Sequence, residues 1–149
     1  MRPASFILLF AAPICFTNSS FGQNDFTKLA TSTDSSYGYS AENPLKTKKG
    51  NLVKSIINSE NFLSGLKTED NQSLIYLFRG TVSNPTYKEP KVRIYNRYTG
   101  VPLSGKSGLL DKYVFVTSNT RDTVRLFVDT YNKGTLLLPI GLKFEQRKD

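Results

Sequence analysis

Two runs of alternating residues near the C-terminus constrain the fold of this chain more than any other feature. Apolar and polar side chains alternate through residues 110–117 and again through residues 124–129, which is the period of a β-strand. The polar segment 118–122 between them is short, so we predict an antiparallel hairpin. The apolar run 136–138, which ends at Pro139, is predicted to add the third strand of a meander.

One helix is indicated earlier in the chain. Between residues 52 and 66 the apolar side chains recur at helical spacing. Asn58 or Ser59 can cap this short helix, which we predict to end at Leu66. Its apolar face requires a sheet to cover it.

Two further strands complete the predicted elements. Residues 74–82 are rich in strand-forming side chains and predict a strand with a bend or bulge at Arg79 and Gly80. Residues 91–96 alternate and predict another strand. Together these elements predict an α+β fold: a single small domain with a mainly antiparallel sheet of about five strands and one short helix packed on one face.

The first 22 residues have the three parts of a secretory signal peptide. Arg2 supplies positive charge, residues 6–16 are mostly apolar, and small residues precede an expected cleavage ahead of Gln23. The apolar run is too short to cross a membrane. We therefore expect an exported protein without a transmembrane segment that is periplasmic, envelope-associated or secreted.

Length and composition divide the remainder into a lead-in and one domain. A chain of 149 residues with 38% hydrophobic residues can form one core. Residues 23–36 are polar and predict a flexible lead-in, which leaves residues 37–149 as a single α+β domain. Cys15, the only cysteine, lies in the signal peptide, so we expect no disulfide in the mature domain. The residues before Cys15 do not suit a lipoprotein cleavage site, and the sequence leaves lipid anchoring open.

The composition excludes several classes of chemistry. The chain has no histidine, which excludes histidine-based acid–base catalysis, Ser-His-Asp triads and histidine-ligated zinc. The absence of cysteine from the mature domain excludes thiol catalysis. We predict no cofactor and no metal site.

Residues 100–107 match the phosphate-loop spelling G-x-x-x-x-G-K-S. Such a loop binds phosphates only between a strand and a helix. A strand is predicted after Ser107, so we interpret these residues as a glycine-rich surface loop.

A basic and aromatic surface is the main candidate for binding. The predicted strand 91–96 and the loop after it carry cations and tyrosines, which suit an anionic glycan or an envelope protein. We expect no nucleic-acid partner. Two alternatives explain the same residues. The cations and tyrosines of the strand can form an ordinary solvated face, and Tyr37 and Tyr39 can cover one end of the sheet. The residues proposed for binding are Tyr37, Tyr39, Arg93, Tyr95, Arg97, Tyr98, Lys106 and Asp111.

Several short segments together resemble a family of small exported proteins from Bacteroidetes. They include Y-G-Y-x-x-E-N-P at residues 37–44, G-L-L-D-x-Y at residues 108–113 and L-P-x-G at residues 138–141. The resemblance spans about residues 34–144 and implies export and this fold. This chain lacks the central cysteine pair and the lipoprotein box that many members carry.

The resemblance implies no catalytic residue, because the family has no established activity. Some members carry an automatic label of 2-dehydro-3-deoxyphosphooctonate aldolase. That enzyme is a barrel of about 250 residues, which a chain of 149 residues cannot build.

Two functions follow from these observations. The first is a non-enzymatic binding or interaction module of the envelope or periplasm. The alternative is a small carboxylate-dependent enzyme acting on an envelope glycan or peptide, which requires two carboxylates to converge in one pocket. Asp111 and Asp129, on neighbouring predicted strands, are the acids expected nearest the core.

Overall fold

The structure is a computed structural model that describes residues 25–88, 95–100 and 108–146. The predicted signal peptide, Arg93, Lys106, and most of the predicted strand 91–96 and of the phosphate-loop pattern lie outside these residues. No helix of the described part is long and apolar enough to cross a membrane.

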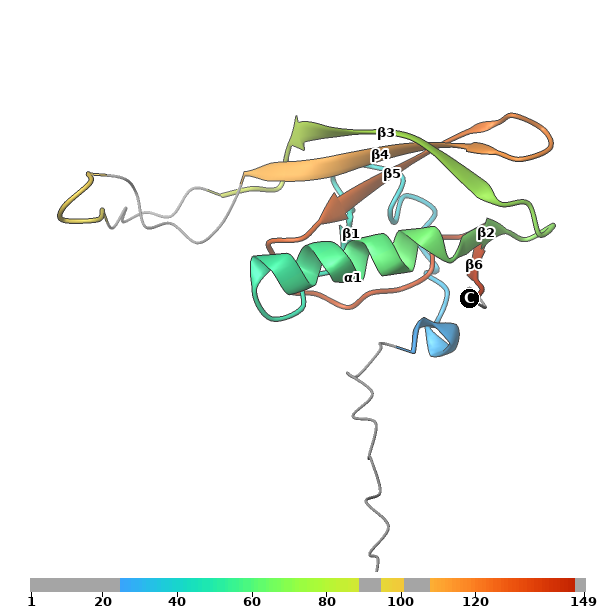
Figure 1. Cartoon of the computed structure of the whole chain (residues 1–149), viewed down its shortest axis with the longest axis horizontal. Helices are drawn as coiled ribbons and strands as arrows, with labels where there is room; N and C mark the ends of the chain where they lie inside the picture. Colours follow the sequence, from blue (N-terminus) through green and yellow to red (C-terminus); the bar gives the residue numbers. More distant parts are fainter. Residues whose placement is uncertain (1–24, 89–94, 101–107, 147–149) are drawn as a thin grey trace, which may run out of the picture.

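The predicted α+β fold is confirmed. In chain order the elements are η1 (Phe26–Lys28), β1 (Leu45–Lys46), α1 (Leu52–Ser64), β2 (Leu66–Thr68), β3 (Leu74–Ser83), β4 (Leu109–Thr117), β5 (Thr123–Asp129) and β6 (Leu142–Phe144). The strands form a four-stranded sheet with the order β1-β5-β4-β3 and a two-stranded sheet of β2 and β6. Figure 1 shows α1 lying along one face of the four-stranded sheet.

The β4–β5 hairpin is confirmed, but the predicted third strand of the meander is wrong. Residues 136–138 join no named strand in the described part of the chain. Leu138 instead exchanges backbone hydrogen bonds with the N-terminal segment, donating to Ala30 O and accepting from Ser32 N. The strand that closes the chain is β6, which pairs antiparallel with β2. Local alternation could not reveal either partner because both lie far away in the sequence.

The N-terminal segment is packed on the domain where a flexible lead-in was predicted. Its described part, residues 25–36, begins with η1, whose Phe26 is buried. The Phe26 ring meets the edges of Phe62 and Phe144 at centroid distances of 5.4 and 5.2 Å. One buried aromatic side chain therefore anchors an otherwise polar segment.

Helix α1 begins earlier than the predicted caps. The side chain of Asn51 accepts a hydrogen bond from Lys54 N–H at 2.9 Å, so Asn51 is the N-cap. Asn58 and Ser59 lie inside the helix and are buried. The Asn58 side chain donates to the Thr47 carbonyl at 2.9 Å, and the hydroxyls of Ser59 and Thr47 share a hydrogen bond at 2.6 Å. These buried polar contacts hold the helix against the chain that follows β1.

The core lies between α1, the helix-facing side of the four-stranded sheet and the N- and C-terminal segments. Its members from the sheet include Leu45, Tyr113, Phe115, Leu126 and Val128. Because residues directly opposite each other on paired strands share a face, this set defines the core face of the sheet.

Candidate interaction edge on strand β3

Strand β3 is the outermost strand of the four-stranded sheet and carries an exposed apolar run. Ile75, Tyr76, Leu77 and Phe78 are 47%, 56%, 51% and 51% exposed. Within the described residues the sheet has no strand beyond β3. We call residues 74–79 on this side the open edge. It places large exposed apolar side chains on the last strand of the sheet, and an edge of this kind is a template for pairing with another chain.

The composition of β3 is that of a central strand. Leu74 to Phe78 are five consecutive large apolar residues, without the polar alternation of a strand that has one face in water. Both sides of such a strand are normally covered. The topology nevertheless places it at an edge of the sheet, so its sequence and its position disagree.

The strand predicted over residues 74–82 is confirmed, but its irregularity is misplaced. The register with β4 shifts between Tyr76 and Phe78, so that Leu77 is the extra residue of a bulge. At the predicted site the pairing continues regularly, with Gly80 opposite Lys112. The bulge changes which side chains of the open edge share a face.

Arg79, the only charged residue of β3, is ion-paired. Its Nη2 lies 2.9 Å and its Nε 3.1 Å from Oδ1 of Asp111 on β4. Its guanidinium carbon lies 5.6 Å from the centre of the Tyr113 ring. Burial opposes the charge of Arg79, but the hydrogen bond with Asp111 holds its pKa above the ordinary value. The open edge therefore presents no uncompensated charge.

Tyr113 connects this ion pair to the aromatic core. Its ring stacks on Phe115 at 6.4 Å, and Tyr76 packs against both rings at 6.5 and 6.1 Å. Burial raises the pKa of Tyr113 to about 12, Arg79 lowers it, and the carboxylates of Asp111 and Glu60 raise it. A phenol in this state stays neutral and acts as packing rather than as an acid–base group.

Asp111, one of the predicted binding residues, is buried on the core face. Its Oδ1 is engaged by Arg79, whereas its buried Oδ2 has no hydrogen-bond partner in the described chain. It lies opposite Thr81 of β3 and Val128 of β5. The structure places it behind the open edge, where it supports Arg79, and away from direct contact with a surface partner.

Asp111 and Asp129 do not converge, which the enzymatic alternative requires. Val128 is opposite Asp111 and shares its face, so the next residue, Asp129, points to the other face. Asp129 forms an ion pair with Lys46 at 2.6 Å and also accepts hydrogen bonds from Tyr131 and Asn132. Each carboxylate thus has its own cationic partner on its own side of the sheet. No group of three or more potential metal-ligating side chains occurs within the described ranges.

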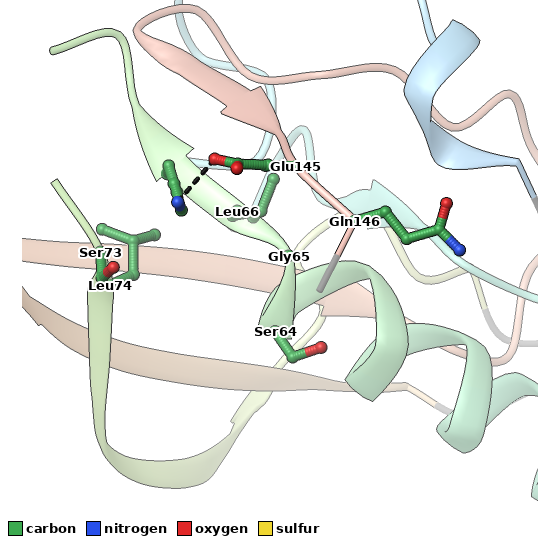
Figure 2. A pocket seen from close by; sticks show the side chains of 8 residues that line it. Ser64, Gly65, Leu66, Ser73, Leu74, Glu145 and Gln146 are labelled. Carbon is green, nitrogen blue, oxygen red and sulfur yellow. Dashed lines mark ion pairs between the residues drawn. The ribbon is translucent and has the colours of Figure 1, made fainter. Parts of the chain in front are cut away.

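One small pocket lies next to the start of the open edge. It has a volume of about 260 Å³ and lies where β2 separates from β3 (Figure 2). The Lys67–Glu145 ion pair, at 2.5 Å, crosses one wall. Its lining residues are Ser64, Gly65, Leu66, Lys67, Ser73, Leu74, Glu145 and Gln146. The opposed charges neutralise each other, and the pocket contains none of the residues predicted to bind.

Tyr37 and Tyr39 have structural roles. Tyr37 is buried, and its hydroxyl donates to the carbonyl of Thr135 and accepts from the Leu137 N–H. The Tyr39 hydroxyl donates to the carbonyl of Ile140 at 2.7 Å. Both side chains tie the N-terminal part of the domain to its C-terminal segment.

The described members of the predicted basic surface lie in one exposed turn. Tyr95 is 52% and Tyr98 93% exposed, and Arg97 is exposed as well. The turn is held by Asn96, whose side chain accepts from the Tyr98 N–H at 2.8 Å. Figure 1 shows this segment far from the helix-facing side of the sheet. Tyr37, Tyr39 and Asp111 instead lie in or against the core of the domain, so the described members of the predicted set do not form one site.

The open edge was not predicted as a site from the sequence. The available signal was the unbroken apolar run of residues 74–78. That run predicts a strand covered on both faces, and only the strand order shows that one neighbour is missing.

No protein-family model, curated protein or solved structure matches this chain. The function is therefore inferred from the residues and their arrangement.

Proposed function

We propose that this chain is an exported, non-enzymatic interaction module of the periplasm or envelope that binds an extended polypeptide segment by strand addition at the open edge. The observation that carries the proposal is the four consecutive exposed apolar residues on the outermost strand. Long apolar edges of this kind are normally shortened, charged or covered in soluble proteins. A β-strand from a partner provides backbone hydrogen bonds and covers the side chains on both faces.

Export is proposed from the signal-peptide pattern of residues 1–22 and agrees with the resemblance to small exported Bacteroidetes proteins. The family assignment is proposed on the same short segments. The charge of the open edge also indicates which chemical class of partner it binds. Because Arg79 is paired with Asp111, the open edge favours an apolar polypeptide over an anionic glycan.

In-cell photo-crosslinking tests the site. A photoreactive phenylalanine replaces Phe78 in one version of the full chain and Tyr98 in another, both exposed aromatic positions. We expect a protein adduct from position 78 that is lost when Leu77→Lys is added, because a lysine opposes strand pairing at an edge. Adducts only from position 98 would transfer the function to the basic and aromatic turn. The absence of an adduct at position 78 would reject the open edge.

A further inference from the structure

One oxygen of Asp129 is hydrogen-bonded to both an amine and a carboxamide. Its Oδ2 accepts from Lys46 Nζ at 2.6 Å and from the side-chain Nδ2 of Asn132 at 2.9 Å. The Asp129 side chain is fully buried, whereas that of Lys46 is 26% exposed. An amine and a carboxamide held on one buried oxygen are the reactants of an amide-forming reaction, and the oxygen between them is placed to move protons.

The three side chains are fixed by different parts of the chain. Lys46 on β1 lies opposite Asp129 at the end of β5, so both side chains share a face. The carboxylate holds Asn132 at both ends, since Oδ1 accepts from its backbone N–H at 2.9 Å and Oδ2 from its side chain. A Cβ at Gly134 would lie 2.6 Å from Cγ of Lys46, so the glycine lets the segment after Asn132 pack against the lysine stem.

We propose that Lys46 and Asn132 join in an intramolecular isopeptide bond, with Asp129 as the catalytic acid–base group. The Lys46–Asp129 ion pair is the state before the reaction. This covalent modification goes beyond the proposed function and is independent of the open edge.

Proton transfer through Oδ2 of Asp129 balances the reaction. A proton passes from Lys46 Nζ to Oδ2, which frees the lone pair of the amine to attack Cγ of Asn132. The bond from Cγ to Nδ2 then breaks, and Nδ2 leaves with its own protons and the two that Nζ has given up. One ammonium group and one carboxamide thus become one secondary amide and one ammonium ion. The Asp129 carboxylate is regenerated, and no oxidant or reductant is consumed.

Burial favours the uncharged pair that reacts. It is the largest single influence on the pKa of Asp129 and raises it, although the hydrogen bonds from Lys46 and Asn132 leave this pKa below the ordinary value. The ion pair is therefore the resting state. The neutral amine and acid cost less free energy here than the same pair would in water, because desolvation penalises the charged forms.

The bond would give the domain a covalent link that it cannot obtain from a disulfide. The only cysteine of the chain is Cys15, in the predicted signal peptide. The isopeptide bond would join β1 to the segment after β5 and enclose residues 46–132, which include α1 and strands β2 to β5. A cross-link around a long loop restricts the unfolded chain, as a disulfide does.

Intact-mass spectrometry of the full chain during incubation of the folded protein tests the bond. We expect the mass of the wild type to fall by one ammonia with time, and proteolysis to release two peptides joined through Lys46 and Asn132. Lys46→Arg keeps the positive charge but cannot supply a neutral amine, so it should retain its full mass. Asn132→Ala lacks the carboxamide and should retain its full mass as well.

The matched control is Lys67→Arg. Lys67 also forms an ion pair with a carboxylate, that of Glu145, and this variant should cross-link as the wild type does. An ammonia loss that persists in Lys46→Arg comes from cyclisation of an asparagine or glutamine and overturns the inference. A wild type that keeps its full mass after prolonged incubation, while its circular dichroism spectrum shows a folded chain, overturns it too. Should either variant fail to fold, the joined peptides of the wild type decide the question alone.

Discussion

The β1 edge and the β3 edge terminate the same four-stranded sheet, but β1 is short and buried whereas β3 carries a run of exposed apolar side chains. Strand β1 is two residues long and its Leu45 is fully buried. The pairing of this edge with β5 continues on either side of β1, since Gly38 O accepts from the Phe127 N–H at 2.8 Å and the Thr47 N–H donates to Asp129 O. We call this the closed edge.

The two edges also differ in how completely the nearby buried carboxylate is hydrogen-bonded. At the closed edge Asp129 accepts from Lys46, Tyr131 and Asn132, so the carboxylate is surrounded by donors. Behind the open edge, Asp111 on β4 has one partner, Arg79, and one oxygen without a partner in the described chain. The side chains of the closed edge are thus buried and paired, while the apolar side chains of the open edge are exposed.

The largest expected effect is at the centre of the closed edge. Asp129→Ala removes the acceptor for Lys46, Tyr131 and Asn132, and should lower the free energy of unfolding by about 3–5 kcal/mol. Urea denaturation measures this change in the free energy of unfolding. Glu69→Ala is the control, because Glu69 is exposed and should change stability by less than about 0.5 kcal/mol. Equal effects would mean that the buried carboxylate does not stabilise this edge.

The same substitution at the two edges separates them directly. Leu45→Ala deletes a fully buried side chain and should cost about 2–5 kcal/mol. Leu77→Ala changes a side chain that is 51% exposed, and should cost less than about 1 kcal/mol. Chemical denaturation at matched low concentration compares them. Comparable losses would show that the open edge is packed within the monomer.

Removal of the arginine from the open edge should have an intermediate effect. Arg79→Gln leaves the carboxylate of Asp111 buried without its cation, at a cost of about 1–3 kcal/mol. Adding Asp111→Asn to Arg79→Gln removes the unpaired charge and should recover part of the loss. A double variant less stable than Arg79→Gln would contradict this account of the ion pair.

The smallest expected effect is a pH dependence at the closed edge. Burial would raise the pKa of Asp129, but hydrogen bonds from Lys46 and Asn132 and the charge of Lys46 hold it below the ordinary value. Stability from a lowered pKa is present above the unfolded value of about 3.9 and is lost as pH falls through the folded value. The stability difference between wild type and Asp129→Asn should therefore shrink in acid, as thermal denaturation can measure. A difference that stays constant down to about pH 2 would contradict the lowered pKa.

The helix and the hairpin could be predicted from the sequence, whereas most contacts between distant segments could not. The β4–β5 hairpin follows from alternation and a short turn, and α1 follows from helical spacing. The burial of Phe26 and the pairing of β2 with β6 depend on distant residues, so local patterns missed both. Tyr37 and Tyr39 were proposed for binding, but the sequence was equally consistent with the structural role that they have.

The sequence by itself determined the elements, because side-chain periodicity and turn residues act between neighbours in the chain. It also determined that β3 is apolar on both sides. Only the tertiary structure decided that this strand stands at an edge, because strand order results from contacts between segments far apart in the sequence. The bulge that lets Ile75 and Phe78 share a face is likewise a property of the pairing with β4. Together, the apolar strand and its position at the edge create the open edge on which the proposed function depends.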